Sequence, residues 1–321
     1  MKLGQIIRKL LPIIGIGLFV YLLIKWDILK VIQQVKNVNL FYILLALILT
    51  FFFLIIQTVK WYVIARKQKI TIPFIDAFKI NLISSFYGSV TPSKIGSIMR
   101  IDYLNRYKGT TGKGLSNFVI DKVLDLSSLF ILTLVFSFLF YKSLISNSYW
   151  YLICAMFGVM IILSLILYRK ESSKRFLKFV HRLFIPKKLK EKSKELFNSF
   201  YEDMPSLGFL SFVFVINLFN WIIGYIAIYF ISLSLGIEIG YIPFLVVMII
   251  STLVAQIPIT INGLGTREYT LINLFGLPMF GSIESVKVFS MSILNIIITT
   301  IVPAIFAIIL LLGKEFRREK R

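Results

Sequence analysis

Charged residues and glycines gather at two short interruptions in otherwise apolar sequence. The first reads TPSKIGSIMR from Thr91 to Arg100, and the second reads TINGLGTRE from Thr260 to Glu268. Glycine allows unusual backbone dihedrals, and a helix that begins after such a break presents N–H groups and a positive dipole end. Cations beside helix starts are the chemistry of an anion receptor, and a lipid phosphate is one such anion. This prediction rests on Lys94, Arg100, Asn262, Arg267 and Glu268, with Pro92, Gly96, Gly263 and Gly265 in the backbone.

A third group of charged residues, Asp121, Lys122 and Asp125, lies inside the apolar segment after the first interruption. On a helix, Asp121 and Asp125 share a face at i, i+4, and Lys122 pairs with Asp125 at i, i+3. An ionisable side chain at membrane depth is costly, so it usually has a function or a buried partner. Two interpretations stay open. The group is either a salt-bridge cluster near the membrane interface or the lining of a polar cavity that holds a cationic headgroup or couples to ions.

Structural roles compete with binding at the other positions too. Arg100 also suits a cytoplasmic positive-inside residue, and Arg267 with Glu268 also suits a structural pair. Neutral polar residues within the apolar segments, among them Gln57, Asn81 and Asn217, are expected to hydrogen-bond between helices.

The composition defines the class of protein that must position these residues. Of the 321 residues, 58% are hydrophobic and only 16% are charged, and the mean hydropathy is +0.85. A soluble domain of this size needs a far more charged surface. Several stretches reach the length of about 20 apolar residues that crosses a bilayer. We expect an all-α polytopic membrane protein.

Residue counts also limit the chemistry. Cys154 is the only cysteine and His181 the only histidine. The chain therefore has no intrachain disulfide and no thiolate metal site, and enzymes that depend on catalytic histidines inside the membrane are excluded. No nucleotide-binding loop is present. We expect a protein that is not an enzyme and uses neither a cofactor nor a metal, with an enzyme that acts on lipid as a weaker alternative.

Apolar spans and basic segments together predict the topology. Spans fall at about 6–24, 40–59, 115–141, 149–168, 207–235 and 285–312, and two broken stretches lie at about 73–107 and 241–280. The positive-inside rule places the N-terminus, the 60–69 stretch, the 169–205 loop and the C-terminal tail in the cytoplasm. The external 25–39 loop has three lysines; Lys25 can snorkel from a short span, and Lys30 and Lys36 count against this scheme. We expect a multi-pass protein of the cytoplasmic membrane with both termini inside.

The segment from 169 to 205 is strongly basic, with eleven Lys or Arg residues against five acids. Basic loops of membrane proteins commonly contact anionic phospholipid headgroups. Its interleaved apolar residues suit an amphipathic helix on the inner leaflet, and a solvated connector is the alternative. We expect no nucleic acid partner, because no recognition module accompanies the charge.

The two broken stretches are counterparts at one offset. Gly265 minus Gly96 is an offset of 169 residues, which also maps the 40–59 span onto the 207–235 span and the 115–141 span onto the 285–312 span. Topology requires each broken stretch to enter and leave by the same membrane face. We therefore predict six full spans plus two re-entrant hairpins, or eight spans, arranged as an inverted repeat. The single membrane domain, 1–321, would divide into halves at about 1–145 and 146–313, with the 169–205 loop inserted in the second half.

These motifs resemble the flippase-like family, also known as the transmembrane region of lysylphosphatidylglycerol synthase. The similar segments are Pro92…Gly96-Ser97…Arg100, Asp121-Lys122…Asp125 and Gly263-Leu264-Gly265-Thr266-Arg267-Glu268. Ser97 and Lys122 depart from the family pattern, which usually has an acid and an arginine there, so a role for an acid at the first hairpin is in doubt.

The resemblance implies translocation of aminoacylated or glycosylated phosphate-linked lipids between leaflets, with membrane lipids as partners. We expect a stand-alone translocator, or one that works with a separate lipid synthase or glycosyltransferase. A secondary transporter of a small soluble anion and a non-catalytic membrane partner of a lipid-modifying enzyme are the alternatives. The sequence predicts no oligomeric state.

Overall fold

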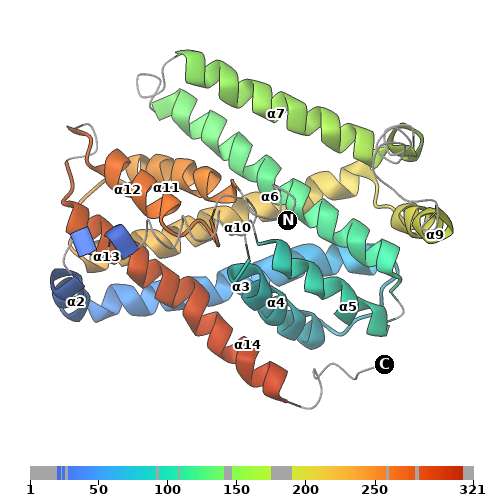
Figure 1. Ribbon diagram of the computed structural model, residues 1–321, viewed down its shortest axis with the longest axis horizontal. Helices are drawn as coiled ribbons and strands as arrows, with labels where there is room; N and C mark the ends of the chain where they lie inside the picture. Colours follow the sequence, from blue (N-terminus) through green and yellow to red (C-terminus); the bar gives the residue numbers. More distant parts are fainter. Residues whose placement is uncertain are drawn as a thin grey trace, which may run out of the picture. The chain divides into compact units, whose positions relative to one another are not determined.

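The computed structural model describes residues 20–22, 24–25, 28–91, 94–107, 109–140, 147–174, 190–257, 260–278 and 282–313. Every regular element in these ranges is helical (Figure 1). Pro92, the middle of the basic segment, the C-terminal tail and most of the predicted first span lie outside the described residues.

The described helices match the predicted spans closely. Three of them are long and apolar enough to cross a membrane: α3 (Leu40–Lys67), α10 (Leu207–Ser234) and the continuous stretch Ser285–Leu312. The last comprises α13 (Ser285–Ile296), a π-helical turn at Ile297–Ile301 and α14 (Val302–Leu312). The predicted spans at 115–141 and 149–168 correspond to α6 (Thr111–Phe140) and α7 (Asn147–Tyr168). The chain is therefore a helical membrane protein.

One predicted boundary is wrong. In the sequence analysis, the second predicted span ends at about residue 59, and the basic 60–69 stretch is assigned to the cytoplasm. Instead, α3 continues for 28 residues to Lys67, and the side chains of Lys60 and Trp61 are fully buried. A lysine with buried partners can lie within an apolar helix, so charge alone does not mark where a span ends.

Each predicted interruption separates helices that are too short to cross a bilayer. The first follows α4 (Phe74–Ser89) and precedes a 3-10 turn at Ile95–Met99, the short α5 (Arg100–Leu104) and a further turn at Asn105–Tyr107. The second lies between α11 (Tyr241–Gln256) and α12 (Thr266–Phe275). The ten residues of α12 rise about 15 Å at 1.5 Å per residue, roughly half of a ~30 Å hydrocarbon core.

Two amphipathic helices complete the described chain. They are α2 (Ile28–Lys36) and α9 (Lys190–Tyr201). Helix α9 lies within the predicted basic segment, and it packs along α6, where Gly112 allows a close approach because a Cβ there would lie 2.7 Å from the backbone nitrogen of Phe200.

Contacts divide the chain into two compact units. Unit 1 comprises 1–58, 75–99 and 219–321, and unit 2 comprises 59–74 and 100–218. Unit 1 therefore holds the first interruption as far as Met99 and the whole second interruption. Unit 2 holds Arg100 and the acidic group of α6. Each unit contains segments from both predicted halves of the repeat. The division into two repeat halves therefore stays a prediction.

Candidate functional site

The two interruptions meet in unit 1 at one small polar pocket with a volume of about 60 Å³. This volume is several times the minimum of about 10–15 Å³ that a single buried water needs. Lys94 comes from the first interruption, and Asn262 and Arg267 come from the second. The remaining lining belongs to the last turns of α11: Thr252, Ala255 and Gln256.

Arg267 is held in place by its neighbours in α12 and α13. Its Nη2 donates to Glu268 Oε1 at 2.9 Å and to Ser292 Oγ at 3.0 Å, and its Nε donates to Glu268 Oε1 at 3.2 Å. The side chain keeps 16% of its surface exposed. Arg267 is therefore oriented by a fixed acceptor while it still lines the pocket.

Glu268 is a structural residue of this site. It is fully buried; its Oε1 accepts from Ser292 Oγ at 2.7 Å, and its Oε2 accepts from the backbone N–H of Gly265 at 2.6 Å. An acid that reaches back to the residue before its helix forms half of a capping box. The start of α12 is therefore partly capped by its own side chain. Fewer N–H groups are free there than the sequence analysis predicts.

The same local geometry recurs in the two interruptions at the predicted offset. Lys94 and Gly263 both have positive φ angles, 55° and 75°. Ser97 Oγ donates to the Lys94 carbonyl at 2.7 Å, and Thr266 Oγ1 donates to the Gly263 carbonyl at 3.1 Å. An offset of 169 residues relates both pairs. Positive φ is uncommon for a residue with a side chain, so Lys94 is held in an unusual conformation beside the pocket.

Close packing explains the glycine in the first interruption. The backbone N–H of Gly96 donates to Thr91 Oγ1 at 2.7 Å. A Cβ at position 96 would overlap the Tyr87 carbonyl oxygen and would lie 2.7 Å from Thr91 Oγ1. The turn therefore requires glycine at this position.

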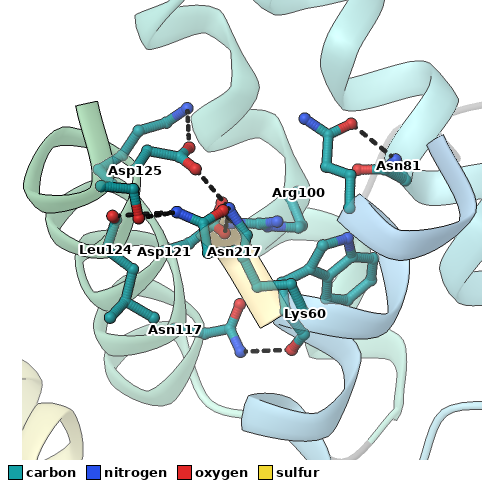
Figure 2. Close-up of polar contacts among 12 residues, drawn as sticks. Lys60, Asn81, Arg100, Asn117, Asp121, Leu124, Asp125 and Asn217 are labelled. Atoms are coloured by element: carbon teal, nitrogen blue, oxygen red, sulfur yellow. Dashed lines mark hydrogen bonds and ion pairs between the residues drawn. The ribbon is translucent and has the colours of Figure 1, made fainter. Parts of the chain in front are cut away.

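A second polar site, in unit 2, is a buried ion cluster centred on Lys60 (Figure 2). Lys60 Nζ lies 2.9 Å from Asp121 Oδ1, 2.5 Å from Asp125 Oδ1 and 3.0 Å from Asn217 Oδ1. Asn217 in turn donates to the Leu124 carbonyl at 3.0 Å and to Ser128 Oγ at 2.8 Å. The cluster therefore ties α3, α6 and α10 together.

Arg100 belongs to this cluster. Its Nη2 lies 3.0 Å from Asp121 Oδ2, and its guanidinium lies 4.8 Å from the centre of the Trp61 ring. Lys122 lies at the edge, 3.9 Å from Asp125 Oδ2, as the helical spacing predicts. The charges of Lys60 and Arg100 formally balance those of Asp121 and Asp125, while Arg100 Nε has no hydrogen-bond partner among the described residues.

A third group of charges joins the helix ends outside the apolar spans. Asp203, in the connection between α9 and α10, binds Lys113 at 2.8 Å and Lys69 at 2.6 Å. Hydrogen bonds from Lys113 and then Lys69 lower the pKa of Asp203 below its ordinary value of 3.8. This group fixes the start of α10 to the start of α6.

The predicted site residues thus divide between two sites. Lys94, Asn262 and Arg267 line the pocket of unit 1, and Arg100, Asp121, Lys122 and Asp125 form the ion cluster of unit 2. The sequence analysis missed Lys60 and Thr252. The apolar residues on both sides of Lys60 could have indicated that it lies within a helix and needs buried acidic partners. The expected interhelical bonds are present, with Asn81 Nδ2 donating to Gln57 Oε1 at 3.1 Å.

Long apolar helices with short, broken helices between them define a polytopic helical membrane protein. The family model described as the lysylphosphatidylglycerol synthase TM region matches residues 10–307. The chain belongs to this family, which confirms the resemblance drawn from its motifs.

Three relatives carry the description UPF0104 membrane protein. PH1989 of Pyrococcus horikoshii is 24% identical over 95% of this chain and 96% of its own length. MJ1595 of Methanocaldococcus jannaschii is 24% identical over 91% of this chain and 90% of its own length. MJ1078 of the same organism is 29% identical over 58% of this chain and 77% of its own length. The similarity to two of them therefore extends over almost the whole membrane domain.

Proposed function

We propose that this protein moves a phosphate-linked membrane lipid between the leaflets of the cytoplasmic membrane, and that the pocket between its two interruptions binds the headgroup phosphate. One observation carries the proposal: Lys94 and Arg267, 173 positions apart in sequence, line the same small polar pocket. Membership of a family named after a lipid synthase supports a lipid as the substrate.

The chemistry of the pocket suits a phosphate. A phosphate oxygen accepts hydrogen bonds from lysine and arginine, and these charge-assisted bonds are stronger than neutral ones. Asn262 adds a neutral donor to the same lining, whereas the hydroxyl of Thr252 donates to the Met248 carbonyl at 2.7 Å. Glu268 binds Arg267, Gly265 and Ser292, so Lys94 and Arg267 together exceed it by one positive charge. The pocket therefore favours an anion over a cation.

The shape of the interruptions supports re-entrant hairpins rather than pairs of full spans. Helix α12 has ten residues, and α5 has five, against the roughly 20 that a crossing needs. The shared geometry at Lys94 and Gly263 supports the inverted repeat. We therefore retain six full spans with two hairpins and cytoplasmic termini, and broken helices of this kind line the substrate path in many transporters.

The ion cluster of unit 2 has a different part in this proposal. Its cations and acids bind one another, so Arg100 is not assigned to the phosphate and Asp125 is not assigned to a cationic headgroup. We assign the cluster to holding α3, α6 and α10 in register. No catalytic step is included in the proposal.

Proteoliposomes containing a fluorescent phospholipid test the proposal directly. External dithionite bleaches only outer-leaflet probe, so a translocator makes nearly all of the probe accessible. Arg267→Gln keeps a polar side chain but removes its charge, and we expect it to slow bleaching of the inner probe about tenfold, which corresponds to a loss of about 1.4 kcal/mol. Lys36→Gln in α2, which does not line the pocket, should behave as wild type.

Each alternative predicts a different result. A wild-type rate no faster than protein-free liposomes would refute lipid translocation. Uptake of radiolabelled phosphate into the same liposomes, lost in Arg267→Gln while lipid movement is unaffected, would instead indicate a transporter of a small soluble anion. A third outcome would indicate a non-catalytic partner. Neither activity would be present, and a co-expressed lipid-modifying enzyme would need this protein for its activity, whether or not Lys94 and Arg267 of this protein are replaced.

A further inference from the structure

An apolar groove with a volume of about 260 Å³ lies in unit 2. Its walls come from the long helices α6, α7 and α10 and from the end of α9. The side chains that define it are Val123 and Leu124 of α6, Leu165 and Tyr168 of α7, and Leu210 and Phe214 of α10.

The groove offers little to a polar ligand. Ser164 donates its hydroxyl to the Met160 carbonyl at 2.7 Å, and the Tyr168 hydroxyl donates to the Pro205 carbonyl at 3.4 Å. The other side chains of its wall are almost all hydrocarbon or thioether. A polar group placed there would lose its hydrogen bonds to water without replacement, so the occupant must be apolar.

The groove is backed by packed core. Ile120 and Leu124 belong to a buried cluster with Ile64 and Val213, and Met204, Leu210 and Phe214 pack against that cluster. Along α10 the groove runs from Leu207 to Phe214, about 10 Å at 1.5 Å per residue. This length is about a third of a ~30 Å hydrocarbon core, which suits part of one lipid acyl chain.

Cations border the end of the groove near α9. Arg169 and Lys170 directly follow Tyr168 and are exposed, and Lys67 Nζ lies 5.8 Å from the centre of the Phe209 ring. The acid Asp203 at this end is bound by Lys69 and Lys113, so it does not neutralise these cations. An apolar slot with a cationic mouth complements an amphipathic molecule with an anionic head.

We propose that this groove binds one acyl chain of an anionic glycerophospholipid, with its headgroup beside Arg169 and Lys170. The surrounding membrane supplies the ligand, and the groove continues the lipid-facing surface of α10, where Phe212 and Val215 are 60% and 47% exposed. This proposal does not depend on the proposed translocation. A lipid that stays bound in the groove satisfies it whether or not the protein moves lipids between leaflets.

A phosphatidylglycerol with a photoreactive diazirine in one acyl chain tests this site in proteoliposomes. Cross-linked peptides are identified by mass spectrometry while the mole fraction of the photoreactive lipid is raised in phosphatidylcholine liposomes. We expect cross-links at 119–124, 164–168 and 207–214 that saturate at a low fraction of probe. Labelling of exposed lipid-facing positions should rise in proportion to the probe. Replacing part of the phosphatidylcholine with unlabelled phosphatidylglycerol should decrease groove labelling, since the anionic lipid competes for the same site.

Two tryptophan variants control the experiment. Ser211→Trp places a large ring in the groove that Ser211 lines, and it should reduce groove cross-links severalfold. Val215→Trp, on the same helix but outside the groove, should leave them unchanged. Groove labelling that rises linearly in wild type, or that is equal in both variants, would overturn the proposal. So would a protein–protein cross-link that shows residues 175–189 of this chain filling the groove. The saturation measurement uses wild-type protein and stands even if a variant fails to fold.

Discussion

At the scale of single residues, three buried or half-buried arginines and lysines have different roles because they have different partners. Lys60 and Arg100 are bound by Asp121 and Asp125 within unit 2. Arg267 is bound by one acid, Glu268, and still lines a pocket. A cation that is fully compensated stabilises the fold, whereas one that faces a pocket remains available to an anion.

Replacing Lys60 tests the structural role of the ion cluster. Lys60→Met removes the cation that both carboxylates share and leaves Arg100 beside Asp121 and the more distant Lys122 beside Asp125. Breaking a buried pair in this way typically costs about 3–5 kcal/mol. We expect a markedly lower Tm in detergent, measured by thermal unfolding followed by size-exclusion chromatography.

The charge-balanced double variant is the matched control. Lys60→Met with Asp125→Asn leaves Arg100 paired with Asp121, so it should be more stable than Lys60→Met alone. A double variant that is less stable than the single one would show that charge balance does not govern this cluster.

At the scale of helices, the sequence predicted the spans well because each one is a long apolar run. It placed the end of α3 too early, since Lys60 resembles a loop residue until its acidic partners on α6 are known. The pairing of Lys94 with Arg267 in one pocket was equally beyond the sequence, because contacts between segments this far apart depend on the packing of α11 and α12. The local motifs, by contrast, identified Gly96, Gly263 and Gly265 directly.

The first interruption provides a sharp test of these backbone arguments. Gly96→Ala forces a methyl group against the Tyr87 carbonyl and the Thr91 hydroxyl, and overpacking of this kind costs about 1–3 kcal/mol. We expect a lower Tm and slower lipid translocation in the dithionite assay, because the backbone around Lys94 must shift.

Gly208→Ala, near the start of α10, serves as the comparison. A Cβ there meets nothing within 4 Å, and alanine favours a helix over glycine by up to about 1 kcal/mol. This variant should be as stable as wild type or slightly more so. Equal behaviour of the two alanine variants would refute the steric account of Gly96.

At the scale of the whole molecule, the charged groups are arranged in three separate settings. The ion cluster is self-compensated, and the Asp203 group joins helix ends outside the apolar spans. Among the pockets lined by described residues, the one between the two interruptions combines cations from distant parts of the sequence with space for a ligand. Our proposal places a lipid headgroup in this pocket, and a family description that names a lipid synthase supports it.

The most direct test of this account is a double-mutant cycle of Lys94→Gln and Arg267→Gln, measured as the rate of phospholipid translocation in proteoliposomes. Two cations that bind one phosphate share a partner, so their effects should be coupled by at least about 0.5 kcal/mol, with each single variant slower than wild type. Wild-type rates in both single variants, or effects that add within about 0.3 kcal/mol, would contradict the claim that the two interruptions form one phosphate site.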